Sequence, residues 1–208
     1  MRVLVFGASS TQGYWDSRGG WADRLKLYYN EIQMKDFSKD MPKVMNLGIS
    51  DDTTTHIIKR IGPEAGARMN AKGLSFIIQV GSNNAATLNG RPRSTPENYK
   101  SELQKIFDTA RKYSDKILVV GFPAVDETRT DPLPWADMSF LNQDIIVYEE
   151  AAREISKANT LPFVPVHKKF LEAGGNLWSH DGLHPNDAGH QLIFELVRPA
   201  LDQLLAGG

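Results

Sequence analysis

The sequence predicts an α/β fold in which helices cover both faces of a parallel sheet. Short apolar runs alternate along the chain with longer segments whose apolar residues recur at helical spacing. The short runs are apolar almost throughout, as expected for strands that are buried on both faces. A length of 208 residues suits one α/β domain, so residues 1–208 are expected to form a single domain.

In the N-terminal half, three apolar runs alternate with two helical patterns. The run VLVF predicts a strand over Arg2–Gly7, and leucine and tyrosine at helical spacing predict a helix over Trp21–Ile32. Valine, methionine and leucine before a glycine predict a strand over Lys43–Leu47. A stripe of isoleucines predicts a helix over Thr53–Asn70, although its internal Gly-Pro pair should bend or break it. The run LSFIIQV predicts a buried strand over Leu74–Val80.

The C-terminal half continues the alternation. Tyrosine, leucine and phenylalanine at helical spacing predict a helix over Pro96–Lys112, and the run ILVVGF predicts a strand over Lys116–Phe122. A second stripe predicts a helix over Phe140–Lys157, followed by a short strand over Leu161–Val164. The last helix is predicted over Asn186–Leu205, where a Pro-Asn pair marks its start.

Composition and charge argue against several classes of protein. The formal net charge is −1 and both signs are interspersed, so no basic field favours nucleic acid as a partner. The chain has no cysteine, which excludes disulfides, cysteine nucleophiles and cysteine-ligated zinc. No apolar stretch approaches the roughly 18 residues of a membrane helix. The N-terminus also lacks the pattern of a signal peptide, so a cytoplasmic location is expected.

The loop after the first strand, residues 7–13, admits two interpretations. A P-loop requires G-x-x-x-x-G-K-[ST], but here Gly13 comes six positions after Gly7 and is followed by Tyr14 instead of lysine, and G-x-G-x-x-G is absent. A nucleotide-binding protein is therefore the weaker reading. The alternative is a serine nucleophile, which needs a base to accept its proton.

The last loop, WSHDGLHPNDAGHQ, supplies such a base. Asp181 and His184 are three positions apart just before the last helix, so the acid can fix the tautomer of the histidine. Three other residues are weaker candidates for these roles. Ser10 competes with Ser9 as the nucleophile, and His180 competes with His184 as the base but has no acid three positions before it. Asp187 could replace Asp181 as the acid, but it lies in the helix start, where acids interact favourably with the helix dipole in any case. The remaining histidines are expected to be surface or structural residues; they are His56, His167 and His190.

Two loops in the middle of the sequence, which follow the predicted strands Lys43–Leu47 and Leu74–Val80, supply donors that could stabilise an oxyanion. In a parallel sheet, ligands bind outside the carboxyl ends of the strands, and these loops begin there. The Asn83 amide is a neutral donor that titration cannot remove, and the absent side chain of Gly48 would let a backbone N–H face the oxygen. Asparagine and glycine are also common loop residues, so each signal is weak alone.

Taken together, the four loops resemble the four sequence blocks of the SGNH hydrolases, also called GDSL esterases and lipases. The family patterns are G-D-S-[LI]-[TS]-x-G, N-x-G, G-x-N-D and D-x-x-H-P. They match, in the same order, residues Gly7-Ala8-Ser9-Ser10-Thr11-Gln12-Gly13, Asn46-Leu47-Gly48, Gly81-Ser82-Asn83-Asn84 and Asp181-Gly182-Leu183-His184-Pro185. The match spans nearly the whole chain.

The resemblance implies a three-layer α/β/α, flavodoxin-like fold with a parallel sheet of about five strands. It implies Ser9 as nucleophile, His184 as base and Asp181 as the partner of His184. The oxyanion hole would combine the backbone amides of Ser9 and Gly48 with the Asn83 side chain. No metal or organic cofactor is expected, and the partner would be a small-molecule ester.

Two positions depart from the family pattern. Ala8 replaces the aspartate that normally precedes the nucleophile, and Asn84 replaces the aspartate after the oxyanion asparagine. Alanine cannot accept the hydrogen bonds with which a carboxylate would brace the loop. Either the loops are braced in another way and activity survives, or activity is weak.

The expected function is serine-dependent hydrolysis of short-chain acyl or acetyl esters, including acetylated carbohydrate. Acyl transfer, thioester hydrolysis and lysophospholipid hydrolysis by the same residues are alternatives, and a non-catalytic binding protein on a decayed hydrolase scaffold is another. Residues 123–140 read as an irregular surface loop or as a wall of the substrate pocket. Residues 89–95 carry Arg91 and Arg93, which either attract an anionic substrate or face solvent.

Overall fold

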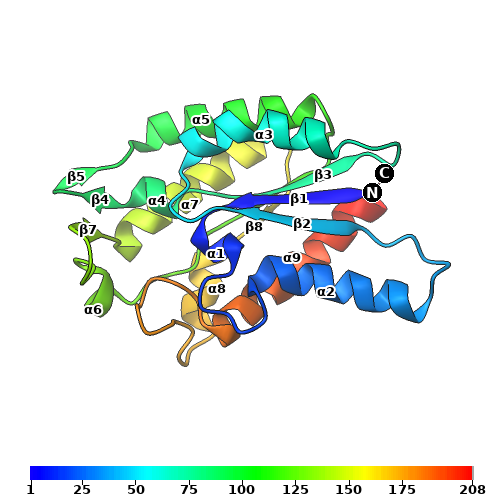
Figure 1. Ribbon diagram of the computed structural model, residues 1–208. Coiled ribbons are helices and arrows are strands. Elements are labelled where there is room, and N and C mark those ends of the chain that lie inside the picture. Colours follow the sequence, from blue (N-terminus) through cyan, green and yellow to red (C-terminus); the bar gives the residue numbers. More distant parts are fainter. Residues whose placement is uncertain (208) are drawn as a thin grey trace.

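A five-stranded parallel sheet forms the centre of the protein, which a computed structural model describes over residues 1–207 (Figure 1). Along the sheet the strands run in the order β2-β1-β3-β6-β8. Their bounds are β1 Arg2–Gly7, β2 Lys43–Gly48, β3 Leu74–Gln79, β6 Ile117–Val120 and β8 Phe163–Val164. The predicted α/β fold with a parallel sheet of about five strands is confirmed.

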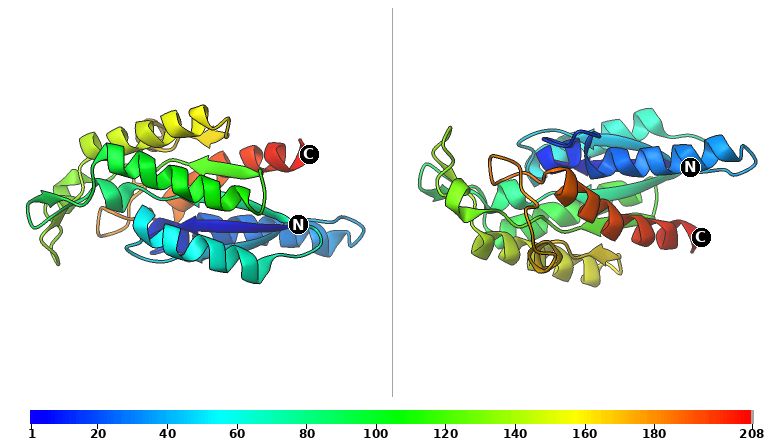
Figure 2. Two further views of the ribbon diagram at one scale, coloured as in Figure 1. Left: turned by 90° about the horizontal axis from the view of Figure 1, so that it is seen from above. Right: turned by 90° about the horizontal axis from the view of Figure 1, so that it is seen from below.

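Helices cover both faces of this sheet, which gives three layers (Figure 2). Helices α2 (Gly20–Lys35) and α9 (Asp187–Ala206) pack side by side on one face. Helices α3 (Thr54–Arg68), α5 (Pro96–Arg111) and α7 (Asn142–Ala158) cover the other. None of the helices in residues 1–207 combines the length and apolarity that crossing a membrane requires.

The period of two along β1 explains the two apolar cores. Leu4 and Phe6 point into the core beneath α3 and α5, whereas Val3 and Val5 point into the core beneath α2 and α9. All four side chains are fully buried. A strand that is buried on both faces must be apolar at every position, which is why the run VLVF predicted it.

The loops at the carboxyl ends of the strands carry short elements that gather at one end of the molecule (Figure 1). Four are short helices, namely α1 Ser9–Gln12, α4 Ser82–Ala85, α6 Glu127–Thr130 and α8 His167–Glu172. Three are two-residue strands in the order β5-β4-β7, namely β4 Thr87–Leu88, β5 Arg91–Pro92 and β7 Met138–Ser139. Residues 123–140 are thus partly ordered as α6 and β7 rather than irregular throughout.

A bend or a break was predicted at the Gly62-Pro63 pair; helix α3 continues through Pro63, so a break there is wrong. Proline removes one backbone donor and crowds the preceding turn, which opposes the helix. Ile57, Ile61 and Ala65 lie on the buried face on both sides of the proline, and all three are fully buried. Burial of that face favours one continuous helix over a broken one.

Candidate active site

A tight turn presents Ser9 at the carboxyl edge of the sheet. Strand β1 ends at Gly7, and α1 begins at Ser9 only two positions later. A Cβ atom at Gly7 would lie 2.0 Å from Thr11 Oγ1 and 2.6 Å from the Gln79 carbonyl oxygen, so only glycine fits there. Gly13 then ends α1 with a φ of 98°, in the left-handed region. The small residues of the loop let the chain turn this sharply and leave Ser9 half-buried.

Ser9, His184 and Asp181 form a continuous hydrogen-bonded chain. His184 Nε2 lies 2.8 Å from Ser9 Oγ, although the two residues are 175 positions apart. On the other side of the ring, His184 Nδ1 lies 2.6 Å from Asp181 Oδ2. Asp181 is 4% exposed, so the carboxylate acts in a largely dry environment. The structure therefore brings together the three residues that the sequence nominated.

The Asp181 carboxylate accepts five hydrogen bonds. Oδ1 accepts from Ser179 Oγ at 2.6 Å and from the backbone amides of Leu183 and His184 at 3.0 and 2.9 Å. Oδ2 accepts from His184 Nδ1 and, at 2.7 Å, from the indole Nε1 of Trp15. Burial disfavours the charged carboxylate, but the hydrogen bonds from His184 and Ser179 outweigh it and hold the pKa of Asp181 well below its usual range.

The rival residues from the sequence occupy other positions. His180 packs edge-on against Trp15, with ring centroids 4.7 Å apart. Asp187 accepts a hydrogen bond from the Ser17 backbone amide at 2.9 Å. Ser10 is half-buried beside Ser9. His184 contacts the hydroxyl of Ser9, not that of Ser10.

The other histidines have structural surroundings. His56 is exposed and caps the start of α3 through Thr53. His190 is fully buried, with Nε2 3.0 Å from the Tyr14 carbonyl oxygen. His167 is 3% exposed, with Nε2 3.1 Å from Asn142 Oδ1.

Gly48 does not offer its amide to the site, and this corrects the prediction from sequence. Its N–H donates to Asn46 Oδ1 at 3.0 Å, because the asparagine side chain folds back over the end of β2. A Cβ at Gly48 would lie 2.3 Å from the Gln12 backbone nitrogen. The glycine is therefore needed for the close approach of β2 to α1, and its N–H is already engaged.

Asp51, three positions later, was missed by the sequence reasoning. It has a φ of 65°, in the left-handed region, and lines the same hollow as Ser9 and Asn83. Within residues 1–207 the backbone amides of Ser9 and Asp51 have no hydrogen-bond partner. The Asn83 amide donates one N–H to the Asp52 carbonyl oxygen at 3.0 Å, which leaves its second N–H free for another acceptor.

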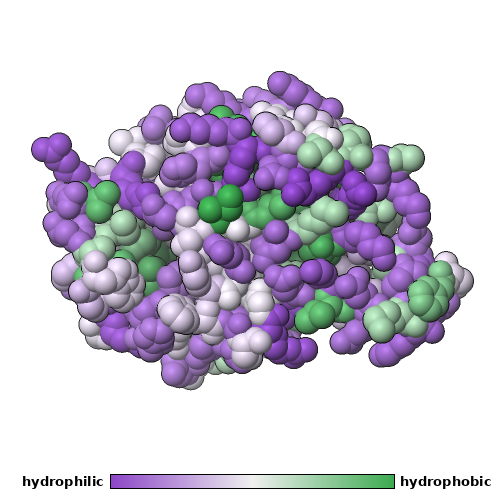
Figure 3. Space-filling model, viewed as in Figure 1, coloured by the Kyte–Doolittle hydropathy of each residue, from purple (hydrophilic) through white to green (hydrophobic). Residues whose placement is uncertain are grey.

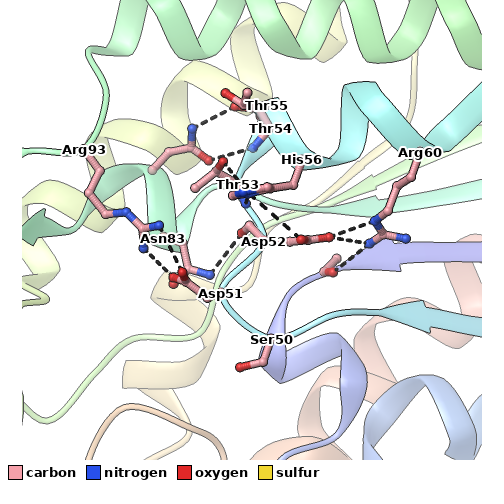
Figure 4. Close-up of polar contacts among 12 residues, drawn as sticks. Ser50, Asp51, Asp52, Thr53, Thr54, Thr55, His56, Arg60, Asn83 and Arg93 are labelled. Carbon is pink, nitrogen blue, oxygen red and sulfur yellow. Dashed lines mark hydrogen bonds and ion pairs between the residues drawn. The ribbon is translucent and has the colours of Figure 1, made fainter. Parts of the chain in front are cut away.

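Two ion pairs brace this loop (Figure 4). Arg93 Nη1 lies 2.5 Å from Asp51 Oδ1, so the arginine that could have met an anionic substrate or solvent is paired within the protein. Arg60 Nη2 lies 2.6 Å from Asp52 Oδ2, and both side chains are mostly buried. Asn84, at the second departure from the family pattern, donates to Thr54 Oγ1 at 2.7 Å at the start of α3.

Two hollows meet at Ser9 and His184. The larger, about 210 Å³, is also lined by Ser50, Asp51, Asn83, Leu133, Trp135, Ala136, Met138, Phe140 and Leu183. The smaller, about 10 Å³, is lined by Ser10, Ser82, Asn83, Pro123, Val125, Phe140 and Leu183 in addition to Ser9 and His184. Recessed apolar side chains show at the end of the molecule that carries β4 and β7 (Figure 3). In residues 1–207 no group of three or more His, Asp or Glu side chains could hold a metal ion.

A protein family and several known proteins are similar to this chain over most of its length. A family model described as the GDSL-like Lipase/Acylhydrolase family matches residues 5–192. The isoamyl acetate-hydrolyzing esterase of Saccharomyces cerevisiae is 19% identical over 201 residues, which cover 93% of this chain and 83% of that protein. A lipase/acylhydrolase from Enterococcus faecalis has a similar structure, with a TM-score of 0.76, 23% identity, and coverage of 97% and 96%. An acetyl xylan esterase does too, with a TM-score of 0.72, 19% identity, and coverage of 96% and 99%.

Proposed function

This chain belongs to the GDSL-like lipase/acylhydrolase family and is an ester-hydrolysing enzyme, and from that premise we propose that Ser9, His184 and Asp181 carry out the reaction. The observation that carries the proposal is the hydrogen-bonded chain from Ser9 Oγ through His184 to Asp181. A serine hydroxyl becomes a nucleophile when a positioned base takes its proton. A buried carboxylate holds the histidine tautomer and stabilises the imidazolium that then forms.

In the first half of the reaction, Ser9 Oγ attacks the ester carbonyl carbon while His184 Nε2 takes the hydroxyl proton. The carbonyl oxygen becomes an oxyanion. The backbone amides of Ser9 and Asp51 and the second N–H of the Asn83 side chain are the donors we assign to it, because each is free and borders the hollow or the serine itself. Asp51 takes the place that sequence reasoning gave to Gly48.

Collapse of the tetrahedral intermediate breaks the bond to the alcohol, which leaves with the proton from His184. Water then attacks the acyl-enzyme, with His184 again as base and Ser9 as the leaving group. Asp181 stays ionised throughout, in keeping with the lowered pKa of its carboxyl.

The sizes of the two hollows support short acyl groups. About 10 Å³ is near the smallest space that admits one water-sized group, so the smaller hollow suits the methyl group of an acetyl ester. The larger hollow then takes the alcohol. Trp135 lines it and is 59% exposed, and an exposed indole face suits a ring such as that of an acetylated sugar. Relatives named for isoamyl acetate and acetyl xylan accord with this assignment.

A series of p-nitrophenyl esters from acetate to octanoate tests the acyl assignment. We expect kcat/KM to be highest for acetate and to fall at least tenfold by hexanoate. Val125→Ala, which enlarges only the smaller hollow, should move the optimum to a longer chain. Met138→Ala enlarges only the larger hollow and is the matched control, with the acyl optimum unchanged. A preference for long chains in the unaltered protein would overturn the assignment.

A further inference from the structure

Trp15 contacts the side of the Asp181 carboxylate that faces the histidine. Its indole Nε1 donates to Oδ2 at 2.7 Å, and the same oxygen accepts from His184 Nδ1 at 2.6 Å. Hydrogen bonds to a charged acceptor are about twice as strong as neutral ones. Trp15 therefore shares with His184 the one carboxylate oxygen on which the orientation of the imidazole depends.

The loop that carries Trp15 is held on both sides of the indole. On the N-terminal side, His190 Nε2 donates to the Tyr14 carbonyl oxygen at 3.0 Å. On the C-terminal side, Asp16 Oδ1 lies 2.6 Å from Arg24 Nη2, in an ion pair whose side chains are 0% and 7% exposed. Asp16 Oδ2 also accepts from the Gly20 amide at 2.7 Å. The indole thus reaches Asp181 from a fixed position.

The backbone of Trp15 has a φ of 63°, which is unusual for a bulky residue. Such conformations persist only where the surroundings impose them, and they cluster at functional sites. Burial of the ring does not account for this one, since Trp15 is 53% exposed. The contact with Asp181 does, because it needs the indole N–H at that place.

We propose that Trp15 is a positioning residue of the active site, which holds Asp181 Oδ2 in line with His184 Nδ1. The inference rests on the proposed roles of Asp181 and His184 and extends them to the loop before α2. A carboxylate fixed by donors on both oxygens cannot rotate away when the imidazole becomes charged. Trp15 lines neither of the two hollows that meet at Ser9, so its effect passes through Asp181.

Trp15→Phe is the direct test, because it removes the N–H donor and keeps an aromatic ring. We expect kcat for p-nitrophenyl acetate to fall about tenfold with KM little changed, the scale of one hydrogen bond to a charged group. Replacement of Trp15 by β-(3-benzothienyl)alanine, which has the shape of tryptophan without the N–H, should give the same loss. Trp178→Phe is the control, because its indole donates at 2.7 Å to the Ala124 carbonyl oxygen rather than to a carboxylate.

A double-mutant cycle separates positioning from a general structural effect. In an Asp181→Ala background, Trp15→Phe should cause no further loss in the rate of phosphonylation by a small fluorophosphonate. An equal loss in both backgrounds would overturn the proposal, and so would an unchanged kcat in the single variant.

A spectroscopic measurement keeps this inference separate from the proposed function. The ¹H–¹⁵N resonance of the Trp15 indole should move upfield in Asp181→Ala, whether or not the protein is active. A wild-type protein without turnover or labelling would refute the proposed function, while an unmoved indole resonance would refute the contact on which the positioning role depends.

Discussion

Arg60 is the residue whose surroundings bear most directly on the carboxylate that is missing at position 8. Its guanidinium lies 5.1 Å from the Phe6 ring centroid, and its Nη2 lies 3.4 Å from the Gly7 carbonyl oxygen. Its Nη1 is buried and has no partner within residues 1–207. Ala8 follows the last residue of β1 in extended backbone, so continuing the period of two from Phe6 would direct an acid at position 8 toward this arginine.

Ala8→Asp should therefore stabilise the protein, because the new carboxylate would pair with the unsatisfied Nη1. We expect the free energy of unfolding to rise by about 1 kcal/mol, the scale of one satisfied buried donor. Urea unfolding at neutral pH measures it. Ala8→Asn, of the same size but uncharged, should gain less, and equal or lower stability in Ala8→Asp would show that Arg60 does not face position 8.

At the scale of elements, the connection between β2 and α3 carries one of the three donors that we assign to the oxyanion, the backbone amide of Asp51. Asp51 adopts a left-handed conformation that costs an aspartate about 1 kcal/mol relative to its ordinary backbone. Arg93 offsets that cost by donating hydrogen bonds to both carboxylate oxygens of Asp51, from Nη1 to Oδ1 at 2.5 Å and from Nη2 to Oδ2 at 3.3 Å. The ion pair thus connects the loop of β4 and β5 to the amide that borders Ser9.

Arg93→Ala should lower kcat/KM for p-nitrophenyl acetate about threefold, because the Asp51 amide would then be held less firmly. In an Asp51→Gly background the same substitution should have almost no effect, since glycine adopts a positive φ at little cost. Arg91→Ala, at an exposed neighbouring position, is the control. Similar losses in both backgrounds would contradict this role of the ion pair.

The first turn of α9 contains a buried histidine, His190, whose protonation affects stability. Burial lowers the pKa of His190 below its usual 6.5, so the ring is neutral in the folded protein. Its Nδ1 lies 3.3 Å from the Trp21 backbone nitrogen, where a neutral ring can accept the hydrogen bond. The unfolded chain takes up a proton at this residue as pH falls through about 6.5, whereas the folded chain takes it up only at a lower pH.

The free energy of unfolding should therefore decrease as pH falls below about 6.5, with the contribution of His190 fully present above that pH. Urea unfolding between pH 5 and pH 7.5 measures the slope. His190→Gln should make the slope shallower but not flat, because burial also lowers the pKa of His167, and His180→Gln, at an exposed position, should leave it unchanged. An unaltered slope in His190→Gln would mean that the ring is protonated in the folded state.

For the molecule as a whole, the parallel sheet explains why residues at opposite ends of the chain meet. Every strand of the central sheet ends at the same edge, and Gly7 lies opposite Gly48 in the register of β1 and β2. Strand β3, in the middle of the sheet, has all six residues buried. Its Phe76 is fully buried and packs 6.4 Å from Phe6, centroid to centroid.

Phe76→Ala should destabilise the protein by about 3–5 kcal/mol, because it removes a large side chain from the central core and leaves a cavity. Phe37→Ala makes the same change where the ring is 81% exposed, and it should cost less than about 0.5 kcal/mol. Denaturant unfolding of both variants measures the difference. Equal effects would contradict the assignment of this core.

Sequence patterns predicted the strands, the helices and the loop motifs, because each of these depends on residues that are close together in the sequence. Apolar runs located the strands, and the four loop motifs brought Ser9, Asn83 and the pair Asp181–His184 to one edge. The role that we assign to Asp51 was not predicted, because it depends on a positive φ and aspartate is not a residue type that indicates one. The contact between Trp15 and Asp181 was not predicted either, because the two residues are 166 positions apart and no sequence pattern links them.

The central claim is that Ser9 is activated by His184, and labelling with a small fluorophosphonate tests it without a choice of ester. Intact-mass measurement followed by peptide mapping should show one adduct, on Ser9. The adduct should disappear in His184→Ala and persist in His180→Ala, because His184 is the ring in contact with Ser9 Oγ. An adduct on Ser10, or no adduct on folded protein, would contradict the account.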